Sequence, residues 1–237
     1  LPILGFGDDA AMLAAAIKDV VLVSIEPPRL DALKRTILEE TPDCKVETDV
    51  SSVPWVGQCD LIVTATSAFG QRVLDVSQCK PGAVILDVAL PPDISAEEAA
   101  VRPDVLVVES GEVLIPGPVD FSFNIGLPPH VAYACLAEAA LLAMEQRFEC
   151  FTLGRDVAPA RVKEIYRLFR RHDFQIAPLR TFGQLLTDEM VADKRERAER
   201  LLRNPAVFER ARAEAAARIA QIPPRAKGVA GVTTLKA

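Results

Sequence analysis

One cysteine stands within the apolar stretch VAYACLAEAALLAMEQR, which covers residues 131–147 and has the composition of a helix. As a thiolate, Cys135 could attack a carbonyl or thioester carbon and carry a covalent intermediate. Pro129 suits the first position of a helix, which would place Cys135 in the second turn. On that helix, Glu138 would share a face with Cys135, whereas His130 would lie about 140° away. We therefore take Cys135 as the candidate catalytic residue, with a plain packing role as the alternative.

A glycine-containing turn opens the chain. The apolar residues 1–4 precede GFGDDA, which fits the pattern G-x-G-x-x-A and leads into an alanine-rich helix. In that pattern the first glycine permits the tight turn, the second lets a pyrophosphate approach, and a small third residue allows close helix packing. The two aspartates in the turn would repel a phosphate. Gly5, Gly7 and Ala10 are the predicted cofactor-binding residues here.

An acidic residue follows the next apolar run at the spacing expected for ribose recognition. Residues 20–25 have the composition of a buried parallel strand, and Glu26 comes 21 positions after Gly5. A carboxylate there would accept hydrogen bonds from an adenosine ribose, whereas the nearby Arg29 could serve a 2′-phosphate. Glu26 could equally precede a turn and face water. The predicted cofactor is therefore NADH or NADPH.

Small and hydroxyl-bearing residues end a further buried strand at 60–67. Such residues leave room for a ribose and a nicotinamide, so Thr64, Ala65, Thr66 and Ser67 are predicted to line the cofactor. Ser67 could instead cap the following helix. Asp87, near the end of the strand at 83–89, is added to this set. No metal ligands are predicted.

These residues need an alternation of strands and helices to bring them together. Strands are expected at 20–25, around Val46, and at 60–67, 83–89 and 104–109, with helices between them. This alternation predicts an α/β fold, a doubly wound parallel sheet of the Rossmann-like type. The expected divisions are a dinucleotide-binding domain at 1–150, a packing helix and edge segment at 151–182, a charged helical extension at 183–222 broken near Pro205, and a tail at 223–237.

Composition limits the function classes. The 237 residues are half apolar, and 27 basic against 33 acidic residues give a formal charge of -6, which argues against binding of nucleic acid. Five cysteines without CxxC spacing and two histidines fit neither a disulfide framework nor a zinc site. No apolar run is long enough to span a membrane, so a cytoplasmic protein is expected. Because the chain starts at Leu1 directly on an apolar run, we expect part of the native protein to lie upstream.

Several motifs in the second half resemble a known family. They are VILDVALPPDI, GEVLIPG, YACLAEAALLAMEQR, LGRD and RHDFQIAPL. In this order they resemble the bacterial long-chain acyl-[acyl-carrier-protein] reductases, which make fatty aldehydes. The resemblance implies that Cys135 takes the acyl group from a carrier protein or CoA thioester and that hydride from NADPH or NADH releases the aldehyde. The resemblance also leads us to expect that this chain lacks the N-terminal region of those enzymes.

The partner would be an acidic carrier protein, so the resemblance makes a basic helical face a candidate docking surface. Its members, spaced along the helix expected at 158–172, are Lys163, Arg167, Arg170 and Arg171. Two other functions stay open. The stretch TATSAFG through ILDVALPPDI also resembles the NADP-binding domain of glutamyl-tRNA reductase. The chain could also be a non-catalytic dinucleotide-binding module that forms a homo-oligomer through its charged C-terminal helices.

Overall fold

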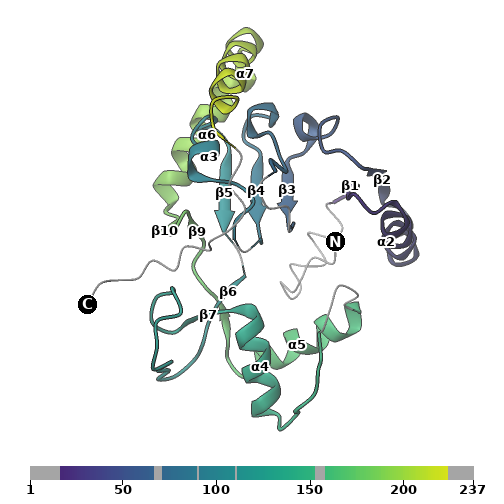
Figure 1. The fold of residues 1–237 in the computed structure, drawn as a ribbon, viewed down its shortest axis with the longest axis vertical. Coiled ribbons are helices and arrows are strands. Elements are labelled where there is room, and N and C mark those ends of the chain that lie inside the picture. Colours follow the sequence, from purple (N-terminus) through teal and green to yellow (C-terminus); the bar gives the residue numbers. More distant parts are fainter. Residues whose placement is uncertain (1–16, 67–70, 90, 110, 153–157, 224–237) are drawn as a thin grey trace. The chain divides into compact units, whose positions relative to one another are not determined.

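The computed structural model describes residues 17–66, 71–89, 91–109, 111–152 and 158–223. The chain folds into two compact units, each made of two separate stretches (Figure 1). The first unit contains Leu1–Val50 and Gly111–Ala177, and the second contains Ser51–Ser110 and Pro178–Ala237.

A five-stranded sheet forms the centre of the second unit. Its strands are β3 (Leu61–Thr64), β4 (Val84–Asp87), β5 (Leu106–Glu109), β9 (Arg180–Thr181) and β10 (Gln184–Leu185), in the order β10-β9-β5-β4-β3. β3, β4 and β5 are parallel, and β9 joins β5 antiparallel. Short runs of branched apolar residues favour such buried parallel strands. The register pairs Thr64 with Asp87 and Asp87 with Glu109, so the strands end together at one edge.

Helices pack on this sheet and complete its core. They are the short 3-10 helices η1 (Val56–Gln58) and η2 (Val76–Gln78), and the α-helices α3 (Ala96–Ala99), α6 (Asp188–Arg203) and α7 (Pro205–Ile219). Ala215 and Ile219 of α7 lie in the same apolar cluster as Ile85 and Val107 of the sheet. Arg72 fastens the end of α7 by donating to the carbonyl oxygens of Ile219 and Ile222, at 3.1 and 2.9 Å. The charged C-terminal sequence thus contributes apolar residues to the core, which its composition did not indicate.

The break between α6 and α7 lies at Asn204, next to Pro205 as predicted. The Asn204 side chain accepts a hydrogen bond from the Val207 N–H at 3.3 Å and caps α7. On α6, acidic residues pair with arginines four positions later, with N–O distances of 2.8 to 3.0 Å. These exposed pairs support the helix by only a few tenths of a kcal/mol each, roughly, so its position depends mainly on packing.

The first unit contains a β-α-β element. β1 (Asp19–Val23) and β2 (Lys45–Asp49) are parallel, and α2 (Pro27–Glu40) connects them. Pro27 and Pro28 lie at the start of α2, where proline fits without losing a helical hydrogen bond. Leu22, Leu30, Cys44 and Val46 form the buried cluster between the helix and the two strands.

The other part of the first unit is an antiparallel sheet with two helices. Its strands are β6 (Glu112–Leu114), β7 (Val131–Tyr133) and β8 (Gln175–Ile176), with β6 in the middle. α4 (Ala134–Met144) follows β7 directly, and α5 (Pro159–Arg171) precedes β8. The buried side chains of this part are Val113, Ala132, Ala137, Leu141, Leu168 and Phe174. β8 forms one edge of this sheet and lies within the stretch 151–182 that was expected to hold a packing helix and an edge segment.

The expected mixed α/β architecture, with parallel strands and C-terminal helices, is confirmed. The finer expectation of one doubly wound sheet is not. The parallel strands β1 and β2 form one sheet, and β3, β4 and β5 belong to another that also contains antiparallel strands. Among the helices of the described ranges, none has both the length and the apolar composition needed to cross a bilayer.

Candidate functional site

A buried carboxylate ends β4 in the second unit. Asp87 is only 2% exposed. Its Oδ1 accepts a hydrogen bond from the Ala89 N–H at 3.1 Å, and its Oδ2 accepts one from the Ile94 N–H at 2.9 Å. Burial raises the pKa of the Asp87 carboxyl above its usual value, the two backbone donors oppose that rise, and the charge of nearby Asp93 adds to it. Asp87 thus holds both ends of the loop that leaves β4.

A buried hydroxyl lies beside this carboxylate. Thr64 is the register partner of Asp87 across the β3–β4 ladder and is 5% exposed. Its Oγ1 makes no hydrogen bond of ordinary geometry within the described residues, although the hydroxyl is near enough to Asp87 to lower the pKa of that carboxyl. Buried polar atoms in proteins nearly always have a full partner. The Thr64 hydroxyl and the Asp87 carboxylate therefore form a buried polar pair at the end of the sheet.

The loop after β4 is also hydrogen-bonded to the segment after β3. Asp93 accepts two hydrogen bonds from Thr66, one from the backbone N–H to Oδ2 at 2.9 Å and one from the hydroxyl to Oδ1 at 2.6 Å. Ala65, between Thr64 and Thr66, is exposed and small. Asp93 is not among the residues predicted from the sequence. Its only signal was a Pro-Pro-Asp turn directly after a strand that was already predicted to reach the site.

The chemistry of this edge suits a ligand rich in hydroxyl groups. Ligands of open α/β sheets bind outside the carboxyl ends of the parallel strands, which is where Thr64, Thr66 and Asp87 lie. Hydroxyl and carboxylate oxygens can accept hydrogen bonds from a ribose. Because Asp87 and Asp93 add negative charge, the same edge disfavours a phosphate.

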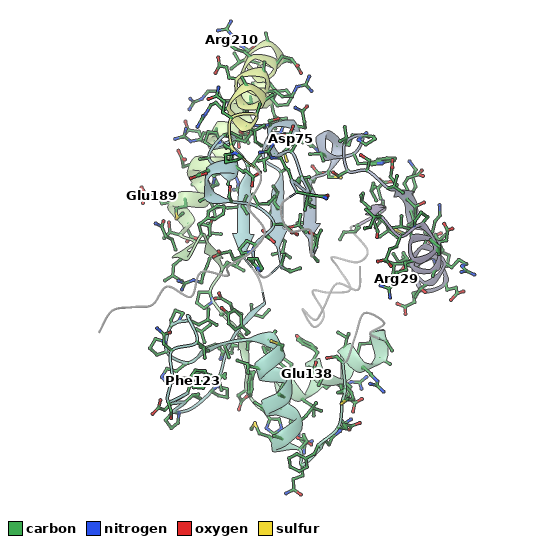
Figure 2. The ribbon with its side chains drawn as sticks, viewed as in Figure 1. Arg29, Asp75, Phe123, Glu138, Glu189 and Arg210 are labelled. Atoms are coloured by element: carbon green, nitrogen blue, oxygen red, sulfur yellow. The ribbon has the colours of Figure 1, made fainter. Side chains whose placement is uncertain are left out.

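Glu26 occupies a comparable position after β1, in the first unit. It is the residue before α2, and its carboxylate lies 3.3 Å from the guanidinium of Arg29, which Figure 2 labels on the helix. Both side chains are about two-fifths exposed. The acid expected to bind a ribose and the base expected to bind a 2′-phosphate therefore form an ion pair with each other.

The predicted start of the Cys135 helix is wrong. His130 has a left-handed backbone, with φ of 64°, and residues 131–133 pair with β6 as β7. Since these residues belong to a sheet, α4 begins only at Ala134, and Cys135 lies in its first turn with an exposed side chain. His130 is not on the helix at all, so its expected angular offset does not apply.

Glu138, the other titratable neighbour of Cys135, is engaged by Thr152. The Thr152 N–H donates to Glu138 Oε1 at 3.3 Å, and the Thr152 hydroxyl donates to the same carboxylate. Figure 2 labels Glu138 on α4. This contact gives the carboxylate a structural role in holding the segment that follows α4.

Some predicted residues fall outside the described ranges, namely Gly5, Gly7, Ala10 and Ser67. The described part of the chain contains no group of three or more histidine, cysteine, aspartate or glutamate side chains arranged to hold a metal ion.

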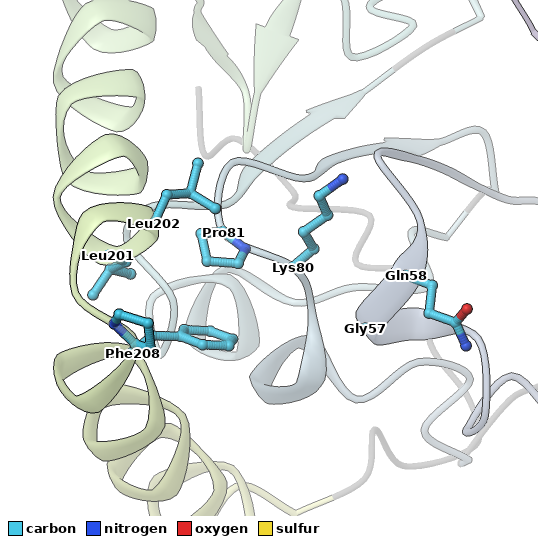
Figure 3. Close-up of a pocket in the computed structure, with 8 residues that line it drawn as sticks. Gly57, Gln58, Lys80, Pro81, Leu201, Leu202 and Phe208 are labelled. Carbon is cyan, nitrogen blue, oxygen red and sulfur yellow. The ribbon is translucent and has the colours of Figure 1, made fainter.

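Two surface hollows in the second unit lie away from this edge. One, of about 360 Å³, is formed by residues that precede β3 and β4 together with the α6–α7 junction, as Figure 3 shows for Gln58, Lys80 and Leu202. The other, of about 320 Å³, lies between the start of β4 and β5 and helix α6. Both are therefore at the amino ends of the parallel strands, opposite Thr64 and Asp87. Lys80 forms an ion pair with Asp60.

The chain is similar to a known protein. Over 137 residues the chain is 37% identical to aminotransferase PigE of Serratia sp. (strain ATCC 39006). The similar region covers 56% of this chain and 16% of that protein, so the chain corresponds to a small part of the relative. No protein-family model matches the chain.

This similarity overturns the family assignment made from the motifs. The relative is an aminotransferase by name, and the prediction of a long-chain acyl-[acyl-carrier-protein] reductase with a fatty aldehyde as product is wrong. The catalytic role of Cys135 stays a prediction. Motifs such as VILDVALPPDI and RHDFQIAPL are therefore insufficient to identify that family. The chain is related to an enzyme.

Proposed function

We propose that the chain provides a segment that binds a nicotinamide dinucleotide, NADH or NADPH, within an enzyme of the PigE type. The observation that carries this proposal is the buried pair of Thr64 and Asp87 at the carboxyl ends of adjacent parallel strands. A hydroxyl without a full partner next to a carboxylate fits the ribose hydroxyls of such a cofactor. A reduced nicotinamide supplies hydride when it is bound.

The residues of this edge would act on the ligand in different ways. Thr64 would donate or accept one hydrogen bond, and Asp87 would accept one while it remains bound to the loop after β4. The small side chain of Ala65 would let a ring approach the backbone. Because Asp87 and Asp93 repel phosphates, the pyrophosphate would lie away from this edge.

The test is a binding titration of the chain with NADH and with NADPH. The chain has one tryptophan, Trp55, in the same unit as Thr64, so energy transfer from Trp55 to the reduced nicotinamide reports occupancy. Thr64→Val keeps the shape of the side chain and removes its hydroxyl, and we expect it to weaken binding by up to about tenfold. Saturable binding is expected for the wild type; a signal that stays linear with added cofactor would remove the proposal.

A second candidate follows from the comparison alone. The relative is named an aminotransferase, and we propose amino-group transfer as the reaction to test on this protein. A coupled assay with a range of amino donors and oxo acceptors would measure it. Binding of dinucleotide without amino transfer would leave the first proposal standing and remove the second.

A further inference from the structure

Asp93 joins the two loops that leave the carboxyl ends of adjacent parallel strands. The last hydrogen bond between the β3 and β4 strands runs from the Val88 N–H to the backbone carbonyl oxygen of Thr64, at 2.9 Å. Beyond this point, the Asp93 carboxylate accepts hydrogen bonds from the backbone N–H and the hydroxyl of Thr66. The contact between Asp93 and Thr66, called the clamp below, thus connects the two loops beyond the end of the sheet.

The clamp itself is anchored in the core. Ile94, the next residue, is 1% exposed, and its N–H donates to Asp87 at 2.9 Å. Ser95 then begins α3 with a capping box, in which Ser95 and Glu98 exchange hydrogen bonds of 3.1 and 3.0 Å. Asp93 therefore directly precedes a residue whose N–H is bound by the buried strand end, and it lies two residues before the residue that caps α3.

We infer that Asp93 is a positioning residue for the dinucleotide site, an inference that rests on the proposed function. Both carboxylate oxygens of Asp93 face Thr66, so Asp93 acts on the ligand through the segment of Thr64, Ala65 and Thr66. With the clamp in place this segment is ordered before the ligand arrives. Without it, part of the binding free energy goes into ordering the segment, and affinity falls.

Three substitutions separate the contributions. Asp93→Asn keeps the size of the side chain but offers one acceptor oxygen to two donors. Thr66→Val removes the hydroxyl bond alone, and Thr66→Ser retains both bonds. We expect Asp93→Asn and Thr66→Val to weaken binding of NADH or NADPH about tenfold each, since hydrogen bonds to a charged group are the stronger class. Thr66→Ser should weaken binding less than Thr66→Val does, because it retains both bonds to Asp93.

The control is Asp193→Asn, the same chemical change in an exposed ion pair of α6. It should leave the dissociation constant unchanged. The double variant of Asp93→Asn and Thr66→Val should bind no more weakly than the weaker single variant, because both changes break one contact.

The outcomes separate this role from its alternatives. A lower unfolding midpoint for Asp93→Asn with an unchanged dissociation constant would make Asp93 structural only and overturn the inference. Weaker binding by Thr66→Val with normal binding by Asp93→Asn would mean that Thr66 contacts the ligand directly, which also overturns it. Absence of binding by the wild type would instead remove the dinucleotide site, and the positioning role with it.

Discussion

A buried ion pair in the second unit provides the sharpest test of the packing described above. Arg102 and Asp104 are 1% and 2% exposed, and the guanidinium binds the carboxylate through two hydrogen bonds of 2.9 and 2.7 Å. The same guanidinium donates to the carbonyl oxygens of Ser77 and Cys79, at 2.9 and 2.7 Å. Its carbon lies 5.4 Å from the ring centre of Phe208 on α7. Arg102 therefore fastens the turns before β4 and β5 to a C-terminal helix.

Asp104→Asn removes the countercharge and leaves the guanidinium buried. Breaking a buried pair in this way costs about 3–5 kcal/mol, whereas an exposed pair contributes about 0.2–1 kcal/mol. Asp193→Asn provides the exposed comparison, since Asp193 and Arg197 are each about half exposed. At a typical dependence of about 2 kcal/mol per molar urea, Asp104→Asn should lower the midpoint by about 2 M and Asp193→Asn by less than about 0.5 M.

Urea unfolding followed by Trp55 fluorescence measures this difference. Trp55 is the single tryptophan and lies in the second unit, so its signal reports the unit that contains the pair. The double variant Arg102→Met with Asp104→Leu removes both charges and should recover part of the loss, although two backbone carbonyls then lose their donor. Equal midpoints for Asp104→Asn and Asp193→Asn would refute the reasoning.

Three further outcomes are expected in the second unit and at α4. Because burial raises the pKa of Asp87, the folded state keeps this proton at pH values where the unfolded chain has lost it. The contribution of Asp87 to stability is thus greatest below the ordinary aspartate pKa of about 3.9, and it declines as the pH rises to the pKa of the folded state. Urea midpoints measured from about pH 4 upwards should show this decline in the wild type. The Asp87→Asn variant should not show it. Burial raises the pKa of Cys79 to about 12, so iodoacetamide near neutral pH should modify the exposed Cys135 and spare Cys79 until the unit unfolds, as peptide mass mapping would show. Ile219→Ala, at a residue 3% exposed, should cost about 2–5 kcal/mol in the urea titration, against little for Val207→Ala at a residue 42% exposed.

The strands and helices could be predicted from local patterns because those patterns reflect local physics. Runs such as residues 83–89 are short, apolar and bounded by Pro-Gly, and β4 forms within them. The start of α4 could not be read in this way. Residues 131–133 are compatible with a helix, and only their pairing with β6, whose paired residues lie 17 to 21 positions earlier, makes them a strand. Long-range pairing overrode a weak local preference.

The candidate site was predictable in part for the same reason. Thr64, Ala65 and Thr66 could be chosen because a strand must end near them, and the structure places Thr64 beside Asp87. The role of Asp93 could not be seen, since its contact with Thr66 spans 27 residues and depends on the path of the loop after β4. Likewise, the alternating charges after residue 188 concealed Ala215 and Ile219, whose burial is decided by packing on the sheet.

The extent of the similarity to PigE bears on what the two proteins share. The longest continuous stretch of either unit is residues 111–177, which is far shorter than the 137 residues that are similar. The similar region must therefore include parts of both units. Each unit consists of two stretches, and a stretch of the other unit lies between them in the sequence. A continuous segment that contains the whole of one unit must therefore also contain that intervening stretch. The similarity to PigE thus extends over parts of both units.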